Sequence, residues 1–128
     1  MLARYTMYRG RRPPDDPLPD GRRQDIRAHT SHCLRAEKEA VRTYLDAPGE
    51  AAWKKLRTAY ERSVQARFRE DRRPFDELAE AAGREDVYVG CSCPTKKNPS
   101  VARCHTVLAL RFMKSHYPDL DVRFPPVV

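Results

Sequence analysis

The sequence contains no run of 18 apolar residues, so we expect no membrane-spanning helix. Its first ten residues lack the basic-then-apolar pattern of a secretory signal. No internal repeat or low-complexity tract interrupts the chain. At 128 residues, the chain has the length of one domain with one core. We therefore expect a single cytoplasmic domain over residues 1–128, and the sequence specifies no oligomeric state.

Cysteines are few but closely spaced, and the expected location limits their chemistry. The chain has four, and three of them fall between residues 91 and 104. In a reducing compartment such residues are free, metal-bound or reactive rather than joined in structural disulfides.

The positive charge lies at the two ends of the chain. Of the net charge of +7, residues 1–35 carry +4, residues 94–128 carry +4, and residues 36–93 carry −1. This distribution favours an anionic partner, either a small ligand or a nucleic acid. The alternative is that the arginines serve solubility alone.

Hydrophobic periodicity predicts an α/β domain with a small, mostly parallel sheet, about four helices and three layers. A Pro/Arg-rich loop or arm is expected over 9–24, because four prolines there exclude regular structure. The stripe from Trp53 to Phe68 is expected to lie in the core. The predicted strands are 3–8, 25–27, 87–90 and 120–124, and the predicted helices are 35–46, 50–70, 75–82 (ending at Gly83) and 104–116.

The segment DVYVGCSCPTKKNPSVARCHTVLALRFM, residues 86–113, predicts the functional site. A short apolar strand ends at Gly90, Cys91 and Cys93 follow it, and Cys104 and His105 begin a helix. Ligands usually bind beyond the carboxyl ends of strands in open α/β sheets. We therefore expect a site on this strand–loop–helix unit.

One hypothesis for this site is nucleophilic chemistry. Cys104 at the start of a helix, between Arg103 and His105, has surroundings that favour a thiolate. Cys91 is the second candidate nucleophile. The same helix end can bind phosphate or carboxylate, with help from Lys96 and Lys97 on the preceding loop.

Two other interpretations of the cysteines stay open. Cys91, Cys93, Cys104 and Cys33 could ligate zinc, with His32 beside Cys33, although Cys-x-Cys is tighter than the usual zinc spacing. An iron–sulfur cluster would also need Cys33 as its fourth ligand. Alternatively, Cys91 and Cys104 are small buried hydrophobes. Under the nucleophile hypothesis no cofactor is expected. Under the metal hypothesis the cofactor is zinc.

The chain resembles the YeaO-like domain of unknown function. The resemblance rests on Tyr5-Thr6, Asp25-Ile26-Arg27, the helix from Trp53 to Tyr60, and Arg103-Cys104-His105, in that order. It covers most of the chain, and the Arg-Cys-His block is its most specific part. It implies a compact α/β domain in which Asp25, Arg27, Cys104 and His105 converge on one pocket, with Cys91 at the adjacent strand end.

These observations lead to a thiol-dependent enzyme acting on a small anionic substrate, phosphorylated or nucleotide-like. Cys104 or Cys91 would be the nucleophile, and His105 or Asp25 would move protons. Arg103, Arg27, Lys96 and Lys97 would hold the anion. A nucleic-acid-binding module that uses the basic ends with Tyr5, Tyr8 and Tyr117 is the alternative from another class.

Overall fold

The computed structural model describes residues 1–126 and confirms a small α/β domain. In chain order the elements are β1 (Leu2–Thr6), β2 (Arg22–Asp25), α1 (Lys38–Asp46), α2 (Glu50–Glu70), α3 (Arg73–Arg84), β3 (Val87–Cys91), the 3-10 turn η1 (Val101–Arg103) and α4 (His105–His116). Among the described residues, no helix is long and apolar enough to cross a membrane.

The three strands form one parallel sheet in the order β1-β3-β2. The central strand β3 pairs through Val87 with Leu2 on one side and with Arg22 on the other. β-Branched residues favour this position, and Val87 and Val89 are fully buried. The predicted mostly parallel sheet is therefore confirmed, with the most apolar strand at its centre.

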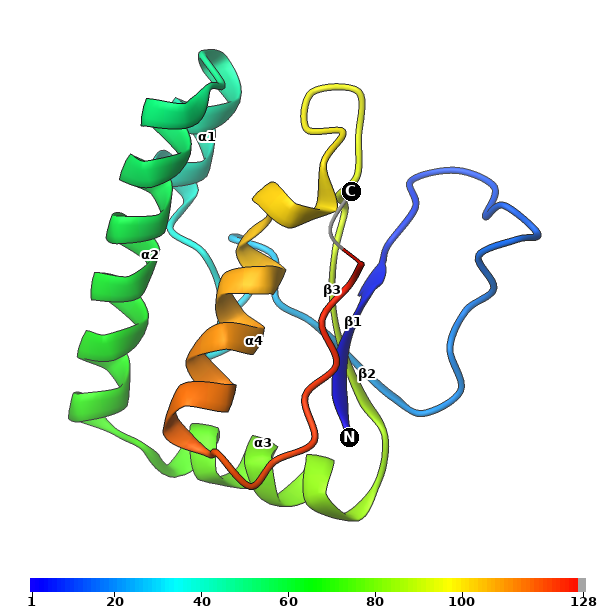
Figure 1. Cartoon of the computed structure of the whole chain (residues 1–128), viewed down its shortest axis with the longest axis vertical. Helices are drawn as coiled ribbons and strands as arrows, with labels where there is room; N and C mark the ends of the chain where they lie inside the picture. Colours follow the sequence, from blue (N-terminus) through cyan, green and yellow to red (C-terminus); the bar gives the residue numbers. More distant parts are fainter. Residues whose placement is uncertain (127–128) are drawn as a thin grey trace.

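α1, α2 and α4 lie on one side of the sheet, and α3 runs across the end at which the strands begin (Figure 1). α4 packs against β1 and β3, α2 packs against α4, and α1 packs against α2. The predicted stripe on α2 is confirmed as core, since Trp53, Leu56, Tyr60 and Val64 are buried. In the expected layered arrangement, α4 lies between the sheet and α2, and the irregular segment 7–21, rather than a helix, runs on the other side of the sheet (Figure 1).

The loop after β1 is shorter than predicted, because residues 22–24 belong to β2 rather than to the loop 9–24. Gly21, with φ of +143°, turns the chain into β2 against the segment before β3. A Cβ atom on Gly21 would lie 2.7 Å from the carbonyl oxygen of Asp86. Only glycine combines this backbone conformation with so close an approach.

Several other boundaries differ from the prediction. α1 begins at Lys38 rather than 35, because the carbonyls of Cys33 and Arg35 both accept hydrogen bonds from the Arg67 guanidinium, each at 2.8 Å. α3 runs through Gly83 to Arg84. The last predicted strand is reduced to a single bridge between Leu2 and Val122.

Candidate functional site

The candidate site lies at the carboxyl edge of the sheet, where β3 ends and α4 begins (Figure 1). Cys91 is the last residue of β3 and pairs with Thr6, the last residue of β1. Cys104 is the N-cap residue of α4, one position before its first turn. The strand–loop–helix unit predicted from residues 86–113 is therefore confirmed as the structural frame of the cysteines.

Three of the four cysteines form a cluster. The Sγ atoms of Cys91, Cys93 and Cys104 all lie within 4.8 Å of one another, and those of Cys91 and Cys104 are 2.9 Å apart. Cys91 and Cys104 are each only 2% exposed, whereas Cys93 is half-buried. We call these three residues the thiol cluster: a buried pair with a third thiol nearer the surface.

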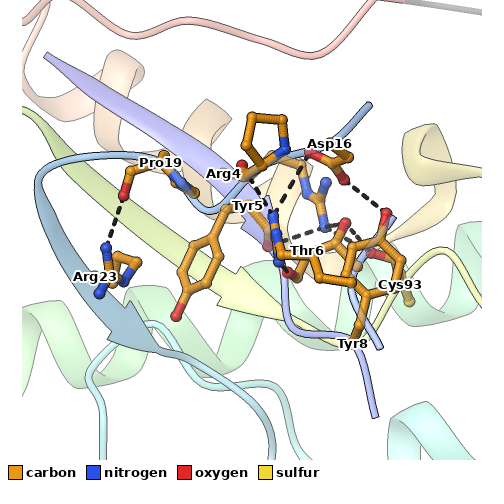
Figure 2. Close-up of polar contacts among 10 residues, drawn as sticks. Arg4, Tyr5, Thr6, Tyr8, Asp16, Pro19, Arg23 and Cys93 are labelled. Atoms are coloured by element: carbon orange, nitrogen blue, oxygen red, sulfur yellow. Dashed lines mark hydrogen bonds and ion pairs between the residues drawn. The ribbon is translucent and has the colours of Figure 1, made fainter. Parts of the chain in front are cut away.

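Arg4 connects β1 to the thiol cluster (Figure 2). Its Nη2 atom donates to the carbonyl of Cys93 at 2.7 Å and lies 3.9 Å from the Sγ atom of Cys91. Its Nε atom donates to Oγ1 of Thr106 at 3.1 Å. The Thr6 hydroxyl also donates to the carbonyl of Cys93, at 2.8 Å. A fixed positive charge therefore lies beside the sulfurs.

His105 is buried, and its surroundings determine its tautomer. Its Nε2 atom lies 2.8 Å from the carbonyl oxygen of Ile26, which can only accept, so Nε2 carries the proton. Nδ1 is then an acceptor, 3.9 Å from the Sγ atom of Cys104. His105 can thus accept a proton on the side that faces the thiol cluster.

Mutual hydrogen bonding separates the pKa values of the three thiols. A hydrogen bond from Cys104 holds the pKa of Cys91 below its usual range, with contributions from Cys93, His105 and Arg4. Hydrogen bonds with Cys91 and Cys93, together with burial, raise the pKa of Cys104. For Cys93, the lowering contact with Cys104 is outweighed by Cys91 and burial, which raise its pKa to about 11. These directions favour Cys91 as the thiol that loses its proton most easily, whereas the sequence pattern pointed first to Cys104.

Asp25 and Arg27 pair with each other at the end of β2. The guanidinium binds the Asp25 carboxylate through Nε and Nη2, and the backbone N–H of Arg27 donates to it at 2.9 Å. Hydrogen bonds from Arg27 lower the pKa of Asp25. Asp25 pairs in register with Gly90, so its side chain lies on the sheet face opposite that of Cys91.

The remaining predicted site residues are dispersed. Arg103 forms an ion pair with Glu50 at the start of α2. Lys96 and Lys97 are exposed on the loop before η1. Cys33 is outside the thiol cluster, and burial raises its pKa to about 11. The four-cysteine ligand set is therefore not assembled. His32, beside Cys33, contacts Gln24 and the backbone of Leu34 instead.

Arg4, Thr6 and Asn98 contact the thiol cluster but were not among the site residues predicted from the sequence. The Asn98 side chain donates to the Sγ atom of Cys93 at 3.2 Å and to the carbonyl of Arg103 at 2.9 Å, which ties the loop together. Period-2 alternation along β1 places Arg4 and Thr6 on the face of Leu2, and that pattern was the available signal. Asn98 had no comparable signal.

The tyrosines of the nucleic-acid hypothesis all have partners within the chain. Tyr8 donates to Asp16 at 2.6 Å, and Tyr117 donates to Asp76 at 2.5 Å beside the Phe68 ring. Tyr5 lies against Gly90.

Comparison with known proteins identified no relative of this chain. No family model, no curated protein and no solved structure matches the chain. The resemblance to the YeaO-like domain therefore stays a prediction, and the site is interpreted from its own residues.

Proposed function

We propose that this protein is a thiol-dependent enzyme that acts on a small anionic substrate at the thiol cluster. The observation that carries the proposal is the contact between Cys91 and Cys104, with Sγ atoms 2.9 Å apart, beside the Arg4 guanidinium and the Nδ1 atom of His105. A thiol flanked by a hydrogen-bond donor, a cation and a base has the surroundings of an activated nucleophile.

Each residue has a distinct role in this proposal. Cys91 is the nucleophile, because it lies nearest the Arg4 charge and accepts from the Cys104 thiol. His105 accepts a proton through Nδ1, while its bond to the Ile26 carbonyl fixes the ring. Arg4 is a positioning residue, since it binds the carbonyl of Cys93 as well as the sulfur. Asp25 orients Arg27 rather than moving protons.

The anionic substrate is inferred from the charges around this edge. Arg27 uses Nε and Nη2 for Asp25, and no described residue accepts from its Nη1 atom. Lys96 and Lys97 are exposed on the adjoining loop. The first backbone N–H groups of α4 add a partial positive charge at the same edge. A phosphorylated or nucleotide-like molecule fits this arrangement.

Site-resolved alkylation tests the proposal. With iodoacetamide at neutral pH, we expect a cluster thiol to react much faster than Cys33. Cys91→Ser should abolish the fast phase, Arg4→Met should slow it more than Arg4→Lys, and Cys33→Ser is the matched control. Inorganic phosphate should slow the fast phase in the wild type and less in Arg27→Ala. Equal rates at all four cysteines would contradict the proposal.

Zinc binding is a second candidate, favoured by the three sulfurs within 4.8 Å of one another. Thiolates are preferred zinc ligands, with Zn–S bonds of about 2.3 Å. Cys91, Cys93 and Cys104 would hold the ion. His105 would be a fourth ligand through Nδ1, oriented by its outer bond to a carbonyl as zinc-binding histidines usually are. Near-stoichiometric zinc, with a chelator lowering Tm, would establish this candidate and displace the nucleophile.

A further inference from the structure

The two buried sulfurs of the thiol cluster lie close together. The Sγ atoms of Cys91 and Cys104 are 2.9 Å apart, and a disulfide requires about 2.05 Å, so closure needs a movement of about 0.9 Å. One sulfur is anchored at the end of β3 and the other at the N-cap of α4, which packs on that strand. The contact is therefore built into the packed core rather than into a loop.

Cys93 connects this buried pair to the surface. Its Sγ atom lies within 4.8 Å of both other sulfurs, but its side chain is half-buried while theirs are 2% exposed. The amide of Asn98 donates to the Cys93 sulfur at 3.2 Å and holds it at the rim of the cluster. Arg4 and Thr6 both bind the Cys93 carbonyl, at 2.7 Å and 2.8 Å. A small oxidant arriving from solvent meets Cys93 first.

We propose that the thiol cluster is a peroxide-reducing centre, in which Cys93 reacts with the peroxide and Cys91 and Cys104 end as a disulfide. This inference goes beyond the proposed function and shares with it the requirement that the same thiols are free of metal. It adds an oxidising co-substrate, hydrogen peroxide, and it assigns different roles to the outer thiol and the buried pair.

The reaction balances in three steps. Cys93 first passes its thiol proton to the neighbouring Cys91 sulfur. The Cys93 sulfur then attacks one peroxide oxygen and the O–O bond breaks; the departing hydroxide takes that proton and leaves as water, and Cys93 becomes a sulfenic acid. One buried sulfur then attacks the Cys93 sulfur, an S–S bond forms, and the expelled hydroxide takes the second thiol proton as water. Finally the other buried sulfur displaces Cys93, whose thiol recovers the last proton. Two thiols are oxidised to one disulfide, and the peroxide is reduced to two waters.

Peptide mapping after one equivalent of hydrogen peroxide tests the inference on the whole 128-residue chain. Trypsin separates Cys104, in residues 104–111, from Cys91 and Cys93, in residues 85–96, and from Cys33, in residues 28–35. We expect residues 104–111 to become cross-linked to residues 85–96 through Cys91, with Cys93 and Cys33 still open to alkylation. A sulfenic-acid trap added during the reaction should label Cys93.

Variants separate the three roles. Cys93→Ala should slow formation of the Cys91–Cys104 cross-link by roughly tenfold or more without changing its identity. Cys91→Ser should accumulate a Cys93–Cys104 cross-link, and Cys33→Ser should behave as the wild type does. The inference is overturned if the wild type forms no cross-link, if Cys93 accumulates as sulfinic acid, or if bound metal protects all three thiols.

The two proposals fail in different ways. Fast selective alkylation without a peroxide-induced cross-link would overturn this inference and leave the proposed function standing. A cross-link without selective alkylation or phosphate protection would support the redox pair and contradict the enzyme on an anionic substrate.

Discussion

The two faces of the three-stranded sheet differ in how deeply their side chains are buried. Toward the helices, Leu2, Val87 and Val89 are fully buried, and the row ends in Cys91. Toward the loop 7–21, Tyr5 lies over Gly90, and Asp25 pairs with Arg27 in partial contact with solvent. Alternation along the central strand thus gives a buried apolar row on the helix face, beside Arg4 and Thr6 of β1, and leaves the loop face partly open to solvent. Cys91 belongs to the helix face, which explains why it is buried.

The largest expected effect lies on the helix face. Leu2→Ala should lower the free energy of unfolding by about 2–5 kcal/mol, because truncating a fully buried side chain leaves a cavity in its place. The exposed loop-face variant Arg23→Ala is the control and should stay within about 0.5 kcal/mol of the wild type. Urea denaturation measures both, and equal losses would remove the distinction between the faces.

Gly90 on β3 allows the side chains of Tyr5 and Met7 to pack directly against the loop face of the sheet. A Cβ atom on Gly90 would lie 2.5 Å from Cε1 of Tyr5 and 3.0 Å from Cγ of Met7. Gly90→Ala should therefore cost about 1–3 kcal/mol by forcing both side chains away. Gly83→Ala in α3, where a Cβ meets nothing within 4 Å, should instead stabilise by about 0.5–1 kcal/mol. Opposite shifts in Tm are expected, and a neutral Gly90→Ala would mean that Tyr5 packs loosely.

The smallest expected effect concerns the ion pair on the loop face. The pKa of Asp25 is lowered in the folded chain by its hydrogen bonds with Arg27, so the stability that it contributes is present above the ordinary Asp value and is lost as pH falls through the folded value. Asp25→Asn should cost less than about 1 kcal/mol at pH 7, since the pair is partly exposed.

Unfolding measured against pH checks this prediction. The wild type and Asp25→Asn should converge in stability as pH falls from the ordinary Asp pKa through the lower folded value, where the carboxyl group becomes protonated. Asp119→Asn, at an exposed carboxylate with no ion pair among the described residues, is the matched control. A stability difference that is constant with pH would mean that Asp25 acts through packing rather than charge.

The elements that were predictable are those whose burial leaves a periodic pattern. The stripe on α2 predicted that helix with both of its ends, and the apolar run at Val87–Val89 predicted the strand that leads into the thiol cluster. Alternation also implied that Asp25 and Cys91 lie on opposite faces, but using that signal requires the strand register.

Contacts between distant segments were not predictable in this way. Arg4 resembles an ordinary polar residue of an edge strand until α4 places Thr106 beside it. Arg103 is adjacent to Cys104 in sequence, yet its side chain reaches Glu50 on another helix. Cys33 is distant from the other cysteines in sequence, and that distance does not reveal whether the fold brings it to the thiol cluster. Tertiary packing determines which partner each of these side chains reaches, and the neighbouring sequence does not indicate that partner.

The strand order has a consequence for how the chain folds. β1 and β2 are both made early, but neither pairs with the other, and each waits for β3 between them. Leu2 cannot pair with Val87 until Val87 has been synthesised. Closing a loop of this length has an entropic cost, which is incurred before the sheet contacts can offset it. The sheet can therefore form only after β3 has been synthesised, and the thiol cluster can form only after Cys104. A nascent chain that stops before residue 87 cannot make these strand pairings.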